Sequence, residues 1–270
     1  LVLLQGYLEH QGSGWSYTLD YLERFLGTCL AAGEPAVPSP HGGYLALMQA
    51  LGLRTGQLHQ ALAKPTEDPA FGQEPPEPGD AGRWAGQVRD EAERTLAELE
   101  RKRDGPPAVT KAAERLLALR APLLERIDRA AAARPTAVKT RYHGNYNLGQ
   151  VLLVQNDFVI TDFEGEPDRP FAERRRKHSP LRDVAGMLRS LNHAASVALS
   201  RASAERPELR ASLEPFARDW EREAREAFWA GCREGAAGCP SYPADPAEAD
   251  ALVDLFTLEK ALYDIRREMD

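Results

Sequence analysis

Two short β-prone runs near the middle of the chain constrain its fold more than any other feature. Residues 151–154 (Val-Leu-Leu-Val) and 158–161 (Phe-Val-Ile-Thr) are separated by Gln-Asn-Asp at 155–157. Two such runs joined by a three-residue turn predict an antiparallel hairpin. Because a hairpin brings its two ends together, Gln150 and Asp162 are expected to lie side by side although they are 12 positions apart.

Most of the remaining chain has apolar residues at helical spacing. Residues 64–80 are the exception, because they hold five prolines and little periodicity, and they predict a long surface loop. Gly52 and Gly56 are small enough for close helix packing. Residues 83–103 and 107–133, adjacent in sequence, predict an antiparallel helix pair. The predicted helices are 18–30, 44–63, 83–103, 107–133, the region after Ser179, and about 246–269.

The composition argues against nucleic-acid and membrane partners. Acidic residues outnumber basic ones by 41 to 34, which gives a net charge of -7, whereas binding to phosphate backbones usually requires a basic excess. No apolar run approaches the roughly 20 residues that span a bilayer. The three cysteines fit no zinc pattern and suggest reduced thiols in a cytoplasm.

The segments that flank the predicted hairpin carry the residues with chemical potential. Residues 143–150 (His-Gly-Asn-Tyr-Asn-Leu-Gly-Gln) precede it and residues 162–165 (Asp-Phe-Glu-Gly) follow it. An amide oxygen beside a carboxylate is a partial site for magnesium, which prefers oxygen ligands and leaves positions for phosphates and water. Asn145, five residues before Gln150, is placed to face a substrate hydroxyl. This order is that of a kinase catalytic loop and metal-binding loop.

The motif resembles His-Gly-Asp-x-His-x-x-Asn, the pattern of the aminoglycoside-phosphotransferase-like kinases. Within that group, the Leu-Gly-Gln-Val-Leu ending and the Thr-Asp-Phe-Glu-Gly-Glu-Pro that follows are similar to the maltokinases. The similarity spans nearly the whole chain, including residues 179–190 and 258–263. It implies a mainly α (α+β) fold, a protein-kinase-like C-terminal lobe with a small β-hairpin at the active-site rim. Residues 11–270 would form this lobe, with the catalytic-loop hairpin at 143–165.

The resemblance also implies roles for individual residues. Gln150 and Asp162 would bind Mg²⁺, and Glu164 would be a carboxylate near the metal. His143 would brace the metal-binding loop by hydrogen bonding. Glu259 and Tyr263, in the closing helix, would lie on the sugar side.

The start of the chain is expected to be the link between two kinase lobes. Residues 1–7 read as a buried strand, and residues 1–10 as a hinge strand in which Gln5, Gly6 and Tyr7 meet the nucleotide. No lysine occurs before Lys64, so an N-terminal lobe with its ATP-binding lysine is expected to be absent.

Two residues depart from the family pattern. Asn145 replaces the catalytic aspartate and Asn147 replaces the second histidine. An amide can hold a hydroxyl by hydrogen bonding, but it cannot accept its proton. The resemblance therefore predicts a kinase lobe whose catalytic loop is chemically degraded.

Three functions are compatible with this sequence. The first is a catalytically degenerate domain that stabilises or oligomerises a trehalose synthase, because maltokinases are often fused to that enzyme; its partner would be the synthase catalytic domain or a second copy. The second is a fragment or variant of an active maltokinase, which uses ATP and Mg²⁺ to form maltose 1-phosphate. The third is a pseudokinase that binds maltose without chemistry.

Overall fold

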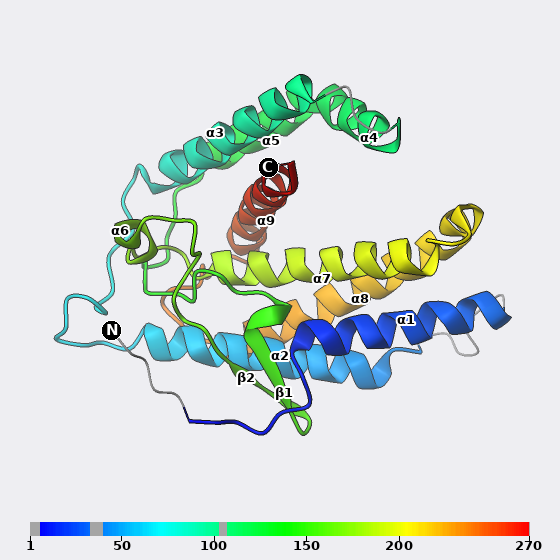
Figure 1. Ribbon diagram of the computed structural model, residues 1–270. Helices are drawn as coiled ribbons and strands as arrows, with labels where there is room; N and C mark the ends of the chain where they lie inside the picture. The colour runs from blue at the N-terminus through cyan, green and yellow to red at the C-terminus, as the bar shows by residue number, and fades with distance from the viewer. Residues whose placement is uncertain (1–5, 33–39, 103–106, 270) are drawn as a thin grey trace. The chain divides into compact units, whose positions relative to one another are not determined.

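The structure is a computed structural model that describes residues 6–32, 40–102 and 107–269. It is mainly helical and contains one small sheet, as the sequence predicts (Figure 1). The elements in chain order are α1 (Gly14–Ala32), α2 (Gly42–Leu62), α3 (Asp80–Arg101), α4 (Pro107–Ala118), α5 (Arg120–Ala131), η1 (Leu148–Gln150), β1 (Val151–Val154), β2 (Asp157–Ile160), α6 (Phe171–Arg174), α7 (Leu181–Ala202), η2 (Pro207–Leu209), α8 (Arg210–Gly235) and α9 (Pro246–Met269).

The chain divides into two compact units. The first contains residues 1–61, 143–175 and 187–238, and the second contains residues 62–142, 176–186 and 239–270. Both segments that flank the hairpin therefore belong to the first unit. The closing helix α9, which carries Glu259 and Tyr263, belongs to the second.

The hairpin forms as predicted, but its turn is one residue shorter. Val151 pairs with Ile160 and Val154 pairs with Asp157, so the turn consists of Gln155 and Asn156 alone. Gln155 has a φ of 57°, the positive value that a type II′ turn requires at its first central position. This turn matches the twist of the two strands, and Asp157 joins the ladder in place of the predicted turn.

A third extended segment pairs with the free edge of β1. Gln11 N donates to Leu153 O over 2.8 Å, and Leu153 N donates to Gly12 O over 3.0 Å. The predicted buried strand is wrong for its described residues, Gly6 and Tyr7, which are exposed and belong to no strand. The reason is that pairing with β1 begins only at Gln11, so nothing covers Tyr7, whose exposure is 92%. Residues 1–5 of that prediction lie outside the described chain.

Glycines on α2 and α8 let the two helices of the first unit cross at backbone contact. A Cβ atom on Gly52 would lie 2.1 Å from Phe228 O, and one on Gly231 would lie 2.2 Å from Gln49 O. Gly56 repeats the contact one turn later, where its Cβ would lie 2.5 Å from Cys232 O. The prediction of close packing at Gly52 and Gly56 is confirmed, and this crossing forms the scaffold against which the functional loop is fixed.

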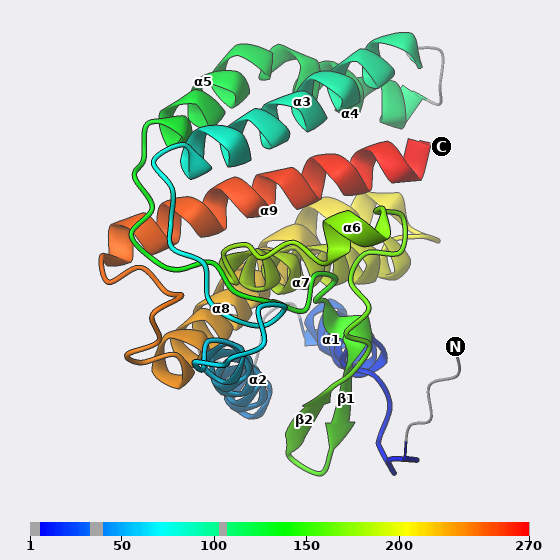
Figure 2. The same ribbon diagram turned by 90° about the vertical axis from the view of Figure 1, so that its left-hand side faces the viewer.

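The helix pair of the second unit is antiparallel, as predicted. Arg89 near the middle of α3 pairs with Asp128 near the end of α5, and Glu100 near the end of α3 pairs with Arg120 at the start of α5. Figure 2 shows α3 and α5 side by side, with α9 alongside.

The single helix predicted over 107–133 is instead two helices, α4 and α5, which separate at Leu119. The physical reason is Pro122, which has no N–H to donate to the carbonyl of Ala118 and whose ring crowds that carbonyl. The chain therefore starts a new helix at Arg120.

Candidate active site

The segment 143–150, called the catalytic loop below, is fixed to two helices of the first unit. Tyr146 Oη lies 2.8 Å from Thr55 Oγ1 on α2, and Leu148 N donates to Ser190 Oγ on α7 over 3.1 Å. Asn147 caps η1, because its Oδ1 accepts from Gly149 N over 2.9 Å. The backbone of this loop is thereby fixed in one conformation.

His143 joins the catalytic loop to the residue that precedes Asp162. Its Nε2 lies 2.7 Å from Thr161 O, and its Nδ1 accepts from Asn145 N over 3.3 Å. Because Nδ1 accepts, the proton of the neutral ring belongs on Nε2, which donates to Thr161. The ring is buried, with Tyr146 and Phe163 at centroid distances of 5.2 and 5.0 Å. His143 thus has the geometry of a brace between two loops.

Gln150 and the residue that precedes Asp162 are hydrogen-bonded at the base of the hairpin. Thr161 donates to Gln150 O twice, from its N over 3.0 Å and from its Oγ1 over 3.2 Å, and Asp162 follows directly. Asp162 is exposed and has a φ of 60°, a left-handed conformation that costs about 1 kcal/mol for a residue with a Cβ. Gln150 Oε1 is buried and accepts no hydrogen bond from the described residues.

These two oxygens fit the protein share of a magnesium site. A buried amide oxygen without a donor is costly unless something else satisfies it, and a cation does so. The described residues include no group of three histidine, cysteine, aspartate or glutamate side chains arranged around one metal. Magnesium is commonly held by one or two protein ligands together with phosphates and water.

Asn145 occupies the position predicted for the catalytic residue. Asn147, two positions later, contacts it and orients its side chain. Asn147 Nδ2 donates to Asn145 O over 3.0 Å and lies 3.4 Å from Asn145 Oδ1. The oxygen of the Asn145 side chain is therefore turned back toward the loop. An amide in this position carries no charge at neutral pH and cannot accept a proton from a hydroxyl group.

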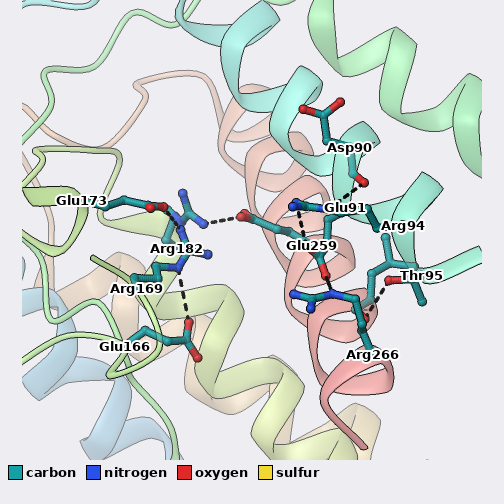
Figure 3. A network of polar contacts seen from close by, with 11 residues as sticks. Asp90, Glu91, Arg94, Thr95, Glu166, Arg169, Glu173, Arg182, Glu259 and Arg266 are labelled. Carbon is teal, nitrogen blue, oxygen red and sulfur yellow. Dashed lines mark hydrogen bonds and ion pairs between the residues drawn. The ribbon is translucent and has the colours of Figure 1, made fainter. Parts of the chain in front are cut away.

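Residues 162–165, called the metal loop below, continue into α6. Glu164 has an exposed side chain, while its carbonyl accepts from Arg174 Nη1 over 3.2 Å. Gly165 has a φ of +75°, and its place against the Arg174 stem leaves only 3.4 Å for a Cβ. Arg169 then pairs with Glu173 over 2.8 Å (Figure 3). Arg174 of α6 is therefore the arginine that contacts the metal loop at its turn.

Glu259 and Tyr263 of α9 are the residues predicted for the sugar side. Glu259 belongs to a charged network (Figure 3). Glu259 pairs with Arg182 at 2.5 Å, and both side chains are largely buried. Tyr263 has Lys260 over its ring, 4.6 Å from the centroid. On the same helix, Arg266 pairs with Glu91 of α3 at 2.7 Å. The Glu259 carboxylate is thus already neutralised from within its own unit.

The hinge residues predicted to meet a nucleotide are not gathered into any described site. Gly6 and Tyr7 are exposed, and Gln5 lies outside the described chain. Sequence reasoning in turn missed Thr55, Thr161 and Ser190, whose hydroxyl groups fix the two loops. Thr55 and Ser190 are 91 and 42 positions from the residues they contact, so no local pattern marks them.

The cysteines and the helices relate to the expectations about thiols and membrane spans. Cys29, Cys232 and Cys239 are all buried, and none forms a disulfide bond. Within the described chain, every helix is too short or too polar to cross a membrane.

Comparison with solved structures identifies the fold. The chain superposes on a glucosamine kinase with a TM-score of 0.74 and 23% identity, over 97% of this chain and 53% of the other. A glucosamine kinase in complex with glucosamine, ADP and inorganic phosphate gives a TM-score of 0.72 at 24% identity, over 97% and 54%. The chain has a kinase-like fold.

Comparison with curated proteins gives the same kind of relative. The chain is 27% identical over 207 residues to a glucosamine kinase of Streptacidiphilus jiangxiensis, which covers 74% of this chain and 40% of the relative. It is 51% identical over 57 residues to a glucosamine kinase of Mycolicibacterium smegmatis, covering 21% and 14%. No protein-family model matches. These relatives are glucosamine kinases and do not single out the maltokinases. The chain spans 40% of the first curated relative and 53% of the first solved kinase.

Proposed function

We propose that this chain is the helical lobe of a sugar-kinase-like protein that has lost phosphoryl transfer but keeps the protein ligands for a metal. The kinase-like fold and the glucosamine kinase relatives support the first part of this proposal. The geometry of the catalytic loop and the metal loop supports the second.

The observation that carries the proposal is Asn145, whose Oδ1 lies 3.4 Å from Asn147 Nδ2. In a kinase, this position accepts or orients the acceptor hydroxyl. General-base assistance is typically worth about 10²–10⁴ in rate, and an amide cannot supply it. The loop around Asn145 is well ordered by hydrogen bonds, so the loss lies in the side-chain chemistry and not in the fold.

The remaining residues have roles that do not require turnover. Gln150 Oε1 and the Asp162 carboxylate would hold Mg²⁺, with Glu164 close by. The metal, when bound, would neutralise the phosphates of ATP. His143 orients both loops through Thr161 O and Asn145 N. These residues favour a protein that binds a nucleotide and a sugar without joining them.

The substrate class of the whole protein is proposed from its relatives. Glucosamine follows from the kinases to which the chain is similar, and maltose follows from the motif of residues 143–167. A role as a stabilising or oligomerising domain of a trehalose synthase, or of a second copy of the chain, follows from the resemblance to the maltokinases. In that structural role, the lobe would be a partner of an active enzyme.

The direct test is a phosphotransfer assay on the full-length natural protein. ATP, MgCl₂ and either glucosamine or maltose are incubated with the protein, and sugar phosphate is measured. We expect no product above a heat-inactivated control. Sustained turnover with either sugar would overturn the proposal and restore the reading of an active kinase.

A further inference from the structure

Position 145 presents a hydrogen-bond donor to a ligand, where a catalytic aspartate would present an acceptor. Asn147 Nδ2 donates to the backbone O of Asn145 and lies 3.4 Å from its Oδ1. The end of the Asn145 amide that is turned away from Asn147 is therefore Nδ2, which can only donate. Asn145 is half-buried, so this donor is accessible from one side.

The local charge is also changed by asparagine at this position. Two carboxylates, Asp162 and Glu164, lie on the metal loop. Arg174 of α6 donates from Nη1 to Glu164 O over 3.2 Å. Because position 145 holds an amide, the catalytic loop adds no third carboxylate to these two.

We infer that this site takes a phosphate-bearing ligand, of the class of sugar phosphates, with Asn145 Nδ2 donating to a phosphate oxygen. The inference rests on the proposed function, because it assigns a ligand to the same loop. A carboxylate at 145 would repel a phosphate at hydrogen-bond distance, whereas an amide attracts it. A neutral sugar hydroxyl is not repelled by a carboxylate, so the change to an amide brings it no comparable gain. The change at 145 thus shifts preference from an unphosphorylated sugar to its phosphate.

Asn147 acts in this scheme as a positioning residue. Its Nδ2 keeps the Asn145 oxygen turned inward, and its Oδ1 separately caps η1 through Gly149 N. The substitution Asn147→Ser retains a capping oxygen while removing the amide donor. This substitution therefore tests the orientation of the Asn145 side chain without removing the cap that stabilises the loop.

The experiment is isothermal titration calorimetry of the full chain in MgCl₂ with three probes: inorganic phosphate, glucose 6-phosphate and glucose. We expect glucose 6-phosphate to bind more tightly than glucose. Asn145→Asp is expected to weaken binding of both phosphate probes at least about tenfold, through like-charge repulsion, and to leave glucose unaffected. Asn147→Ser is expected to weaken them a few-fold, in the range of one hydrogen bond, with an unchanged melting temperature.

The matched control is Asn156→Asp, which makes the same chemical change at the exposed hairpin turn. It should leave all three affinities unchanged. Equal binding of glucose and glucose 6-phosphate, or phosphate binding that Asn145→Asp does not weaken, would overturn the inference. Failure of this inference can be distinguished from failure of the proposed function. Sugar phosphorylation by the natural protein would contradict the proposed function. An inactive protein whose phosphate affinity does not change on substitution at position 145 would contradict only this inference.

Discussion

The catalytic loop and the metal loop meet at the base of one hairpin, yet their hydrogen bonding differs. In the catalytic loop, Asn147 uses both ends of its amide, and Leu148 N has its own acceptor on α7. Gln150, the last residue of the catalytic loop, has a buried Oε1 that accepts no hydrogen bond from the described chain, and the metal loop begins with Asp162 in a left-handed conformation. The rest of the catalytic loop is internally satisfied, whereas the two residues at the base of the hairpin retain an unsatisfied acceptor and backbone strain.

This difference distinguishes the residues that hold the loop in place from the residues that could bind a ligand. Backbone strain and unsatisfied buried atoms persist where a function or a ligand compensates for them. The base of the hairpin has both features, one at Gln150 and one at Asp162, which is the condition expected of a site that still binds a cation. Residues 143–149 have neither, because their described hydrogen bonds are internal or run to the helices that hold the loop.

The largest effect is expected from His143→Ala, which removes the connection between the two loops. The change deletes two hydrogen bonds and a buried ring packed on Tyr146 and Phe163. We expect a loss of about 3 kcal/mol in the free energy of unfolding, measured by urea denaturation. Asn156→Ala in the exposed turn is the control and should cost little. A loss below about 1 kcal/mol at His143 would mean that the loops are held independently.

The next effect tests whether the metal loop still binds a cation. With a dissociation constant of about 1 mM, 10 mM MgCl₂ would stabilise the fold by about 1.4 kcal/mol. Asp162→Asn should abolish this stabilisation in thermal unfolding, because it removes the only charge predicted to ligate the ion. Asp20→Asn, an exposed aspartate on α1, should leave it intact. Stabilisation that survives Asp162→Asn would place the cation elsewhere.

Strain at Asp162 predicts a smaller effect of opposite sign. In the absence of metal, Asp162→Gly should raise the free energy of unfolding by about 0.5–1 kcal/mol, because glycine adopts a φ of 60° freely. Asp162→Ala also removes the carboxylate but keeps the Cβ, so it should bring no such gain. If alanine and glycine behave alike, the carboxylate and not the backbone sets the stability of this loop.

The smallest effect concerns the far end of the hairpin, where Arg54 holds Asp157. Its guanidinium hydrogen-bonds to that carboxylate and lowers the pKa of Asp157. Because the folded pKa lies below the unfolded value of about 3.9, the pair stabilises the fold above about pH 4 and loses this contribution as the pH falls through the folded pKa.

Both side chains of this pair are 43% exposed, so Asp157→Asn should cost only about 0.5 kcal/mol at pH 7. The difference from the wild type should vanish in acid, as measured by chemical denaturation across the pH range. A cost that persists in acid would point to the capping bond from Phe158 N and not to the ion pair.

Much of the fold follows from local sequence patterns. The hairpin, α9 and the antiparallel pair of α3 with α5 all have periodicity or turn signals within a few residues. The break at Leu119 was missed because apolar spacing continues through it, although Pro122 supplies the signal. Residues 6 and 7 were taken for a buried strand on hydropathy alone, which cannot tell whether a partner strand exists.

The site was predictable only in its local part. The pairing of Gln150 O with Thr161 N follows from hairpin geometry, but the link from His143 to Thr161 O depends on the folded position of a ring. The hydrogen bond between the two asparagines could not be read from spacing either, because it depends on which way each amide turns. Long-range anchors such as Thr55 and Ser190 leave no pattern near the motif.

The most direct measurement is the rate of sugar phosphorylation by the full-length natural protein carrying Asn145→Asp with Asn147→His, compared with the unmodified protein under identical ATP and MgCl₂. If the metal loop is intact and only the catalytic loop lacks its base, the double substitution should raise the rate from background by about 10²–10⁴. Asn156→Asp, with the same added charge at the turn, should leave it at background. An unmodified protein that already turns over, or a double variant that stays at background while still binding magnesium, would contradict the account.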